Sequence, residues 1–162
     1  MSTIEKTVVV DVPIRTVYDQ WTQFESFPRF MEGVESVEQI DDKTVHWKAE
    51  IAGVTREWDA EIVDQLPDQQ ITWRATDGTD NQGTVQFAPA DTGTRVTVRL
   101  DYQPEGLVEK AGDVLNFVDR RVSDDLDRFK EFIESRGTET GQWRGEVKPT
   151  GEVDTGGGAP TP

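Results

Sequence analysis

Four polar residues have the types and positions that chemistry on a carbonyl compound would need: Arg56, Tyr102, Arg121 and Asp125. An arginine and a tyrosine at the mouth of a pocket could hold a carbonyl or enolate oxygen, and Asp125 could move a proton. Each residue also has an ordinary alternative. Arg56 adjoins a predicted hairpin end and could point to solvent, whereas Arg121 and Asp125 are four residues apart and could pair on a helix surface. The sequence therefore offers catalytic candidates without assigning a catalytic residue.

Other chemistries lack the side chains that they require. The chain has no cysteine and a single histidine, His46, so it lacks the material for a disulfide, a thiolate nucleophile or a multi-histidine metal site. A Ser-His-Asp triad would have to use His46, which the strand pattern places on an outer face opposite Asp59. We expect a surface pair there, and we expect neither a metal nor a cofactor.

The net charge limits the classes of partner that the protein is expected to bind. The net charge is −15, which argues against a basic patch for nucleic acid and against docking on anionic lipid. No run of eighteen apolar residues is present, and we expect no signal peptide. We therefore expect an acidic, cytoplasmic protein without stable membrane insertion.

One long amphipathic helix is the element that must position these residues. Apolar residues recur at helical spacing between Glu105 and Arg136, and a second apolar row widens the stripe into one broad face. Pro104 precedes the helix and Gly137 follows it. Such a face must be covered by the rest of the chain.

Most of the preceding chain has the alternating pattern of strands. A first strand at Thr3 to Val10 is followed by two short aromatic-rich helices. Pro28 interrupts the helical pattern, so we expect the second helix to be a separate short segment at Phe27 to Met31. From Val34 to Leu100 apolar and polar residues alternate, which predicts an antiparallel sheet with one covered face. The pattern predicts an α+β fold in which a curved antiparallel sheet wraps around the long helix.

Turn signals predict the register of the sheet. A turn at Ala52-Gly53 would place Trp47 opposite Trp58 on the inner face, with Lys48 opposite Glu57 and His46 opposite Asp59 outside. A turn at Pro67-Asp68 would pair Ile62 with Trp73 and Glu61 with Arg74, and a turn at Asp91 to Gly93 would pair Phe87 with Val96. Opposite charges then meet outside while apolar residues meet inside.

This register predicts an apolar ligand pocket between the sheet and the first half of the helix. Three indoles on neighbouring strands beside small alanines suit a planar or chain-like apolar ligand, although the same indoles could instead fill the core. The expected lining residues are Trp47, Trp58, Ile62, Trp73, Ala75, Phe87, Val98 and Leu100 from the sheet, with Val114 and Val118 from the helix.

The sequence divides into a domain at residues 1–136 and a tail at residues 137–162. The tail is rich in Gly, Pro and Thr and has no periodicity, so we expect it to be flexible and largely disordered. Trp143 is unusual in such a segment. It indicates either a loose contact with the protein's own surface or a docking motif for a protein partner.

The chain from Thr3 to Arg136 resembles the START-like helix-grip (SRPBCC) superfamily, in particular its bacterial polyketide cyclase/dehydrase and coenzyme-Q-binding-type group. The segments that carry the resemblance are VVVDVPIRTVYDQWTQFESFPRFM, VTREWDAEIVDQLPDQQITWR and VSDDLDRFKEFIESRG. The resemblance implies a seven-stranded sheet gripping the last helix around a cavity. It also implies that placement of a flexible poly-carbonyl chain, helped by a few polar groups, could suffice for cyclase chemistry without a metal.

Three functions are compatible with these observations. The first is binding of a small hydrophobic or amphipathic ligand by a polyketide cyclase/dehydrase-like domain, with turnover left open. The second is a non-catalytic lipid or quinone carrier or sensor, and the third is a protein-interaction module acting through the Trp143 tail. Clustered polar groups in the pocket would favour an enzyme, an entirely apolar pocket a carrier, and a filled core with a docked tail an interaction module.

Overall fold

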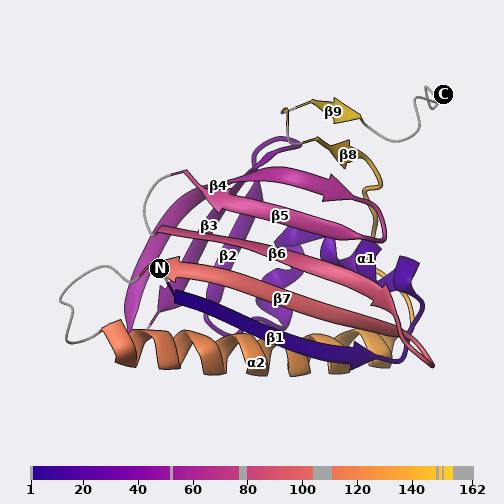
Figure 1. The fold of residues 1–162 in the computed structure, drawn as a ribbon, viewed down its shortest axis with the longest axis horizontal. Helices are drawn as coiled ribbons and strands as arrows, with labels where there is room; N and C mark the ends of the chain where they lie inside the picture. The colour runs from indigo at the N-terminus through magenta and orange to yellow at the C-terminus, as the bar shows by residue number, and fades with distance from the viewer. Residues whose placement is uncertain are drawn as a thin grey trace.

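A computed structural model describes residues 2–51, 53–76, 80–103, 111–148, 150 and 152–154 of the chain. It has the α+β helix-grip architecture, with a curved antiparallel sheet folded over one long helix (Figure 1). Seven strands follow one another in the order β1-β7-β6-β5-β4-β3-β2. Their bounds are β1 (Ser2–Val10), β2 (Val34–Gln39), β3 (Thr44–Ile51), β4 (Val54–Leu66), β5 (Gln70–Ala75), β6 (Asp80–Pro89) and β7 (Thr94–Gln103).

The strand register is the one that the turn signals predict. Trp47 pairs with Trp58, and the same hairpin brings Lys48 to Glu57 and His46 to Asp59. The pairs Ile62 with Trp73, Glu61 with Arg74, and Phe87 with Val96 are likewise present. Two turns use left-handed backbone, with φ of +85° at Gly53 and 63° at Asp68, while Ala52 lies outside the described residues. Correct register matters because a slip of one residue would turn the indoles outward.

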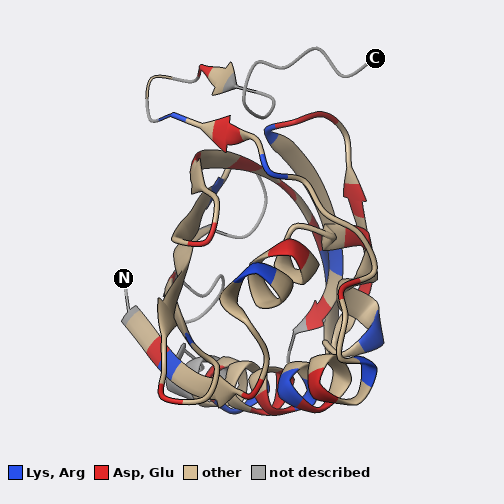
Figure 2. Ribbon diagram, turned by 90° about the vertical axis from the view of Figure 1, so that its right-hand side faces the viewer, with Lys and Arg blue, Asp and Glu red and all other residues tan. Residues whose placement is uncertain are grey.

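The long helix α2 (Ala111–Arg136) runs under the concave side of the sheet. Its predicted first residues, 105–110, lie outside the described residues. The apolar stripe faces the sheet, where Phe129 and Ile133 are fully buried and Val118 and Leu126 nearly so. Seen from the side in Figure 2, the strands curve over the molecule while α2 closes its lower side.

Two short helices fill one end of the space between the sheet and α2. They are α1 (Ile14–Trp21) and the 3₁₀ helix η1 (Phe24–Arg29), which begins earlier than the predicted second helix and contains Pro28. The ring centroids of Trp21 and Phe129 lie 4.8 Å apart, and those of Phe30 and Phe129 lie 5.1 Å apart. This aromatic cluster packs the end of the domain near the C-terminus of α2.

The described part of the tail that follows α2 folds back onto the domain. Two short strands follow α2, β8 (Glu146–Val147) and β9 (Val153–Asp154), and β8 pairs with β4 at Gln65. The physical reason lies in strand length. The pairing of β3 with β4 ends at Glu61, so the last residues of β4 would present a bare edge that β8 covers. Val147 is fully buried there.

Candidate functional site

A cavity of about 210 Å³ lies between the inner face of the sheet, the short helices and the middle of α2. Its walls are predominantly apolar. The lining comprises Trp21, Phe24, Phe27, Met31, Gly33, Val34, Val45, Trp47, Ala49, Glu50, Trp58, Ala60, Ile62, Ile71, Trp73, Asn81, Val98, Leu100, Phe117, Val118, Arg121, Val122, Asp125 and Leu126. A concave apolar site with a few polar groups is the usual form of a small-molecule site.

Indole rings form much of the sheet wall. The rings of Trp47 and Trp58 are stacked, with centroids 6.0 Å apart and planes inclined by 2°. Trp73 lies over Gly83, where an added Cβ would come within 2.6 Å of the indole Cζ2. Ala49 and Ala60 are buried beside these rings. Large flat rings next to small side chains are how this face leaves space unfilled.

The structure places most of the sequence-predicted binding residues on the cavity wall. Seven of them line it: Trp47, Trp58, Ile62, Trp73, Val98, Leu100 and Val118. Phe87 and Ala75 are not lining residues. The ring of Phe87 is buried against Tyr18 and Trp21, in the aromatic cluster at the far end, and Ala75 packs beside Trp58 and Ala60. The side chain of Val114 lies outside the described part of the structure.

The short helices contribute a wall that the sequence reasoning missed. The sequence predicts two short aromatic-rich helices here without assigning their rings to the pocket, yet Trp21, Phe24 and Phe27 all line the cavity. Helical spacing indicates that these rings are buried. It does not indicate whether a buried ring meets another ring or an empty space, so no sequence signal separated these two outcomes.

Arg121 forms part of the polar end of the cavity. Its guanidinium carbon lies 4.7 Å from the centre of the Phe117 ring on the same helix. Gly33 provides the space for this side chain, because a Cβ at that position would lie 1.9 Å from the Arg121 Nη1 atom. The glycine therefore allows Arg121 to reach the cavity wall, where Glu50 also contributes.

Asp125 is the second charged residue of α2 on the cavity wall. Its Oδ1 atom accepts hydrogen bonds from Arg128 Nη2 and, at 3.2 Å, from the Glu32 backbone N–H. The Arg128 Nε also donates to the Phe30 carbonyl oxygen at 3.0 Å. Burial raises the pKa of Asp125 above its ordinary value, and the hydrogen bond from Arg128 opposes that rise. Asp125 pairs with Arg128 rather than standing as the surface partner of Arg121.

Arg56 and His46 do not line the cavity. Arg56 is in register with Ala49 but is not among the lining residues, and the side chain of Tyr102 lies outside the described part of the structure. His46 Nδ1 and Asp59 Oδ1 are 2.7 Å apart, half-exposed on the outer face. The structure thus brings together two of the four candidates, Arg121 and Asp125.

No three His, Cys, Asp or Glu side chains in the described part of the chain are arranged to hold a metal ion. Among the helices of the same part, none is long and apolar enough to cross a membrane.

Comparisons with known proteins agree with the fold. Residues 10–131 match the family model described as polyketide cyclase / dehydrase and lipid transport. An uncharacterized 17.2 kDa protein of Streptomyces lincolnensis, from the melC2-rnhH intergenic region, is 48% identical over 149 residues, covering 91% of this chain and 99% of that protein.

Solved structures extend the comparison. DR_A0006 of Deinococcus radiodurans has a TM-score of 0.67 and 30% identity, and the match covers 84% of this chain and 99% of that one. The ZhuI aromatase/cyclase of Streptomyces sp. R1128 has a TM-score of 0.73 at 18% identity, with coverage of 83% and 94%. At that identity the likeness to the aromatase/cyclase concerns the fold.

Proposed function

This chain belongs to the polyketide cyclase/dehydrase and lipid transport family, and we propose that its cavity binds a small apolar or amphipathic molecule. The observation that carries the proposal is the cavity itself, about 210 Å³ between the three indoles of the sheet and α2. Burial of apolar ligand surface would supply the binding free energy. Arg121 and Asp125 would orient a polar group of the ligand at one end.

Titration with the neutral fluorophore N-phenyl-1-naphthylamine tests this proposal. We expect saturable binding at one site, with quenching of tryptophan emission. Ala60→Leu places extra methyl groups in the cavity and should weaken binding at least tenfold. Ala88→Leu is the matched control, because Ala88 is adjacent to the buried Phe87 and so lies on the outer face of β6. Equal affinity of the two variants would place the probe outside the cavity and contradict the proposal.

A second candidate function is metal-independent cyclisation or dehydration of a poly-carbonyl substrate. The specific observation that favours it is the presence of Arg121 and Asp125 on one cavity wall. Arg121 would hold an enolate oxygen and Asp125 would transfer a proton. Incubation with a linear poly-β-ketone analogue, with Asp125→Asn as comparison, distinguishes the functions. A catalyst gives a cyclised product that the variant loses, whereas a carrier binds the analogue without changing it.

A further inference from the structure

The tail segment Thr140 to Val147, here called the strap, is bound along the C-terminal end of α1. The Thr140 N–H donates to Gln20 Oε1 at 2.8 Å, and Gln20 Nε2 donates back to Thr140 Oγ1 at 3.0 Å. The Trp143 N–H donates to Thr22 Oγ1 at 3.1 Å. Side chain and backbone bonds thus fix the strap to the last turn of this helix.

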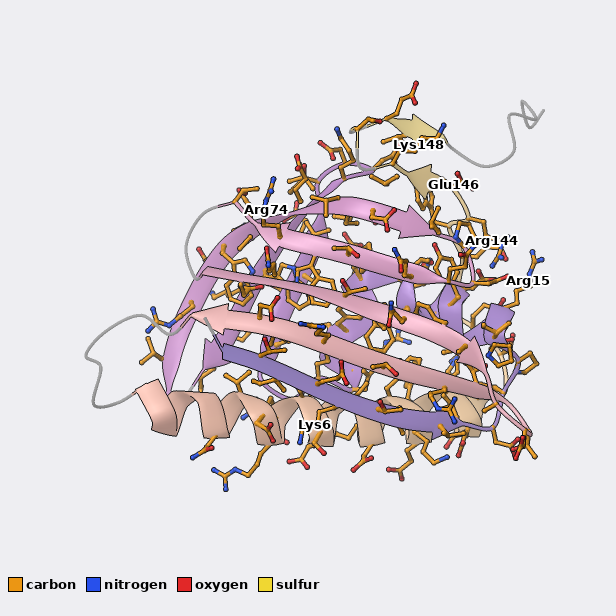
Figure 3. All side chains as sticks on the ribbon, viewed as in Figure 1. Lys6, Arg15, Arg74, Arg144, Glu146 and Lys148 are labelled. Atoms are coloured by element: carbon orange, nitrogen blue, oxygen red, sulfur yellow. The ribbon has the colours of Figure 1, made fainter. Side chains whose placement is uncertain are left out.

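Arg144 is the charged anchor of the strap. Its Nη1 donates to Asp19 Oδ1 at 2.5 Å and its Nη2 donates to Asp68 Oδ2 at 2.7 Å. The guanidinium also lies 5.5 Å from the centre of the Tyr18 ring. In Figure 3, Arg144 lies beside the end of the domain that holds α1, near Arg15.

Asp19 explains why this anchor matters to the fold. Its side chain is fully buried, and an uncompensated carboxylate in that position would be strongly unfavourable. Arg15, from the same helix, approaches only to 3.7 Å. Since Arg144 makes the close contact, the charge that α1 buries is compensated mainly by a residue of the strap.

The residues that hold the strap alternate with residues that form the cavity wall. Asp19, Gln20 and Thr22 contact the strap, whereas Trp21 and Phe24 line the cavity. Release of the strap would therefore leave the wall that carries Trp21 and Phe24 without its outer support.

We propose that the strap is a latch on α1, whose docking and the occupancy of the cavity favour each other. The proposal rests on the proposed ligand-binding function of the cavity. Its physical basis is that one short helical segment contacts the strap on one side and the cavity on the other. Because coupling of this kind is reciprocal, a ligand in the cavity must strengthen strap docking by the factor by which docking strengthens ligand binding.

The first experiment compares probe affinity in full-length variants. Arg144→Ala should raise the dissociation constant of N-phenyl-1-naphthylamine at least fivefold, a typical lower value for coupled sites. Arg144→Lys, which retains the positive charge, should recover part of the affinity. Lys148→Ala is the matched control, because it removes a cation from the same tail whose partner is the exposed Glu152. Unchanged affinity in Arg144→Ala, with the strap released, would overturn the latch and leave the cavity proposal intact.

The second experiment uses the wild-type protein and so does not depend on how well the variants fold. Hydrogen exchange of the Thr140 and Trp143 amides, which donate to Gln20 and Thr22, should slow when the probe saturates the cavity. The Lys148 amide, which donates to the Glu152 carbonyl oxygen, provides the comparison and should change less. Saturable probe binding without any change at Thr140 and Trp143 would overturn the coupling. Failure of the probe to bind at all would instead overturn the cavity function, while the exchange rates still report strap docking.

Discussion

The space between α2 and the sheet is closely packed near one end of the helix and contains a cavity nearer the other. Near the C-terminus of the helix, the rings of Trp21, Phe30 and Phe129 are in contact and Ile133 is fully buried. Nearer its N-terminus, the same helix faces a cavity of about 210 Å³. We refer to these regions as the filled half and the hollow half.

The contrast arises from side-chain volume rather than from periodicity. Both halves of α2 follow the same apolar spacing. The filled half receives the rings of Trp21 and Phe30 against Phe129, whereas the hollow half combines Val118 and Val122 with Ala49 and Ala60 on the facing strands. Trp21 lies at the boundary of the two halves, because its ring also lines the cavity. A binary pattern therefore specifies which face is buried, while the sizes of facing residues decide whether the buried space is filled.

The largest expected effect compares two phenylalanines of the same helix. Phe129→Ala should lower the free energy of unfolding by about 3–5 kcal/mol, because it leaves a cavity among closely packed rings. Phe117→Ala is the matched variant in the hollow half, where the half-buried ring already borders empty space. Its loss should be about 1–2 kcal/mol. Chemical denaturation measures both, and equal losses would contradict the division into two halves.

A smaller effect is expected at Gly83, which supports the indole wall of the hollow half. Gly83→Ala would bring a Cβ within 2.6 Å of Trp73 Cζ2 and 2.8 Å of the Arg99 carbonyl oxygen. Displacement of these groups should lower stability by about 1–3 kcal/mol. In a Trp73→Phe background the loss should be smaller, because the atom that clashes is absent. Strictly additive losses would show that Trp73 does not rest on Gly83.

Each signal in the sequence predicts only the structural property that it encodes. Alternation predicts the face of the sheet on which a side chain lies, and turn residues predict the register, so the pairs Trp47–Trp58 and Ile62–Trp73 follow from the sequence. Alternation does not predict where along the inner face a residue lies. For this reason Phe87 is expected at the cavity and is found in the filled half. Composition does not encode the contacts of residues 140–147, because these contacts depend on a distant edge of β4 and on the buried Asp19. The isolated Trp143 and Arg144 were the available signal.

Asp125 lies at the border between the two halves, and its carboxyl group is largely buried. Burial raises its pKa in the folded state, so the folded protein holds that proton more tightly than the unfolded chain does. Stability associated with this carboxyl must then fall as pH rises from the ordinary value through the raised one. Asp125→Asn does not titrate, so its stability relative to wild type should increase between pH 4 and pH 7.

The control for this pH dependence is Asp127→Asn, which removes an exposed carboxylate from the same helix. Denaturation curves at several pH values should show a relative change only for the Asp125 variant. A wild-type stability that rises relative to Asp125→Asn over this range would mean that the hydrogen bond from Arg128 outweighs burial.

The smallest expected effect lies on the outer face, which contrasts with both halves of the interior. The hydrogen bond to Asp59 raises the pKa of His46 above its ordinary value. The stability from this pair should be fully present below the ordinary pKa of histidine and should be lost as pH rises through the raised value. Asp59→Asn should lower the pKa of His46 and change the free energy of unfolding by less than about 1 kcal/mol, since both side chains are partly exposed and screened by solvent.

Because His46 is the only histidine, its NMR titration is unambiguous. Glu61→Gln, which alters the neighbouring outer pair with Arg74, is the control and should leave the His46 titration in place. An unchanged His46 pKa in Asp59→Asn would mean that the pair does not persist in solution, and that the outer face contributes to the register through the backbone alone.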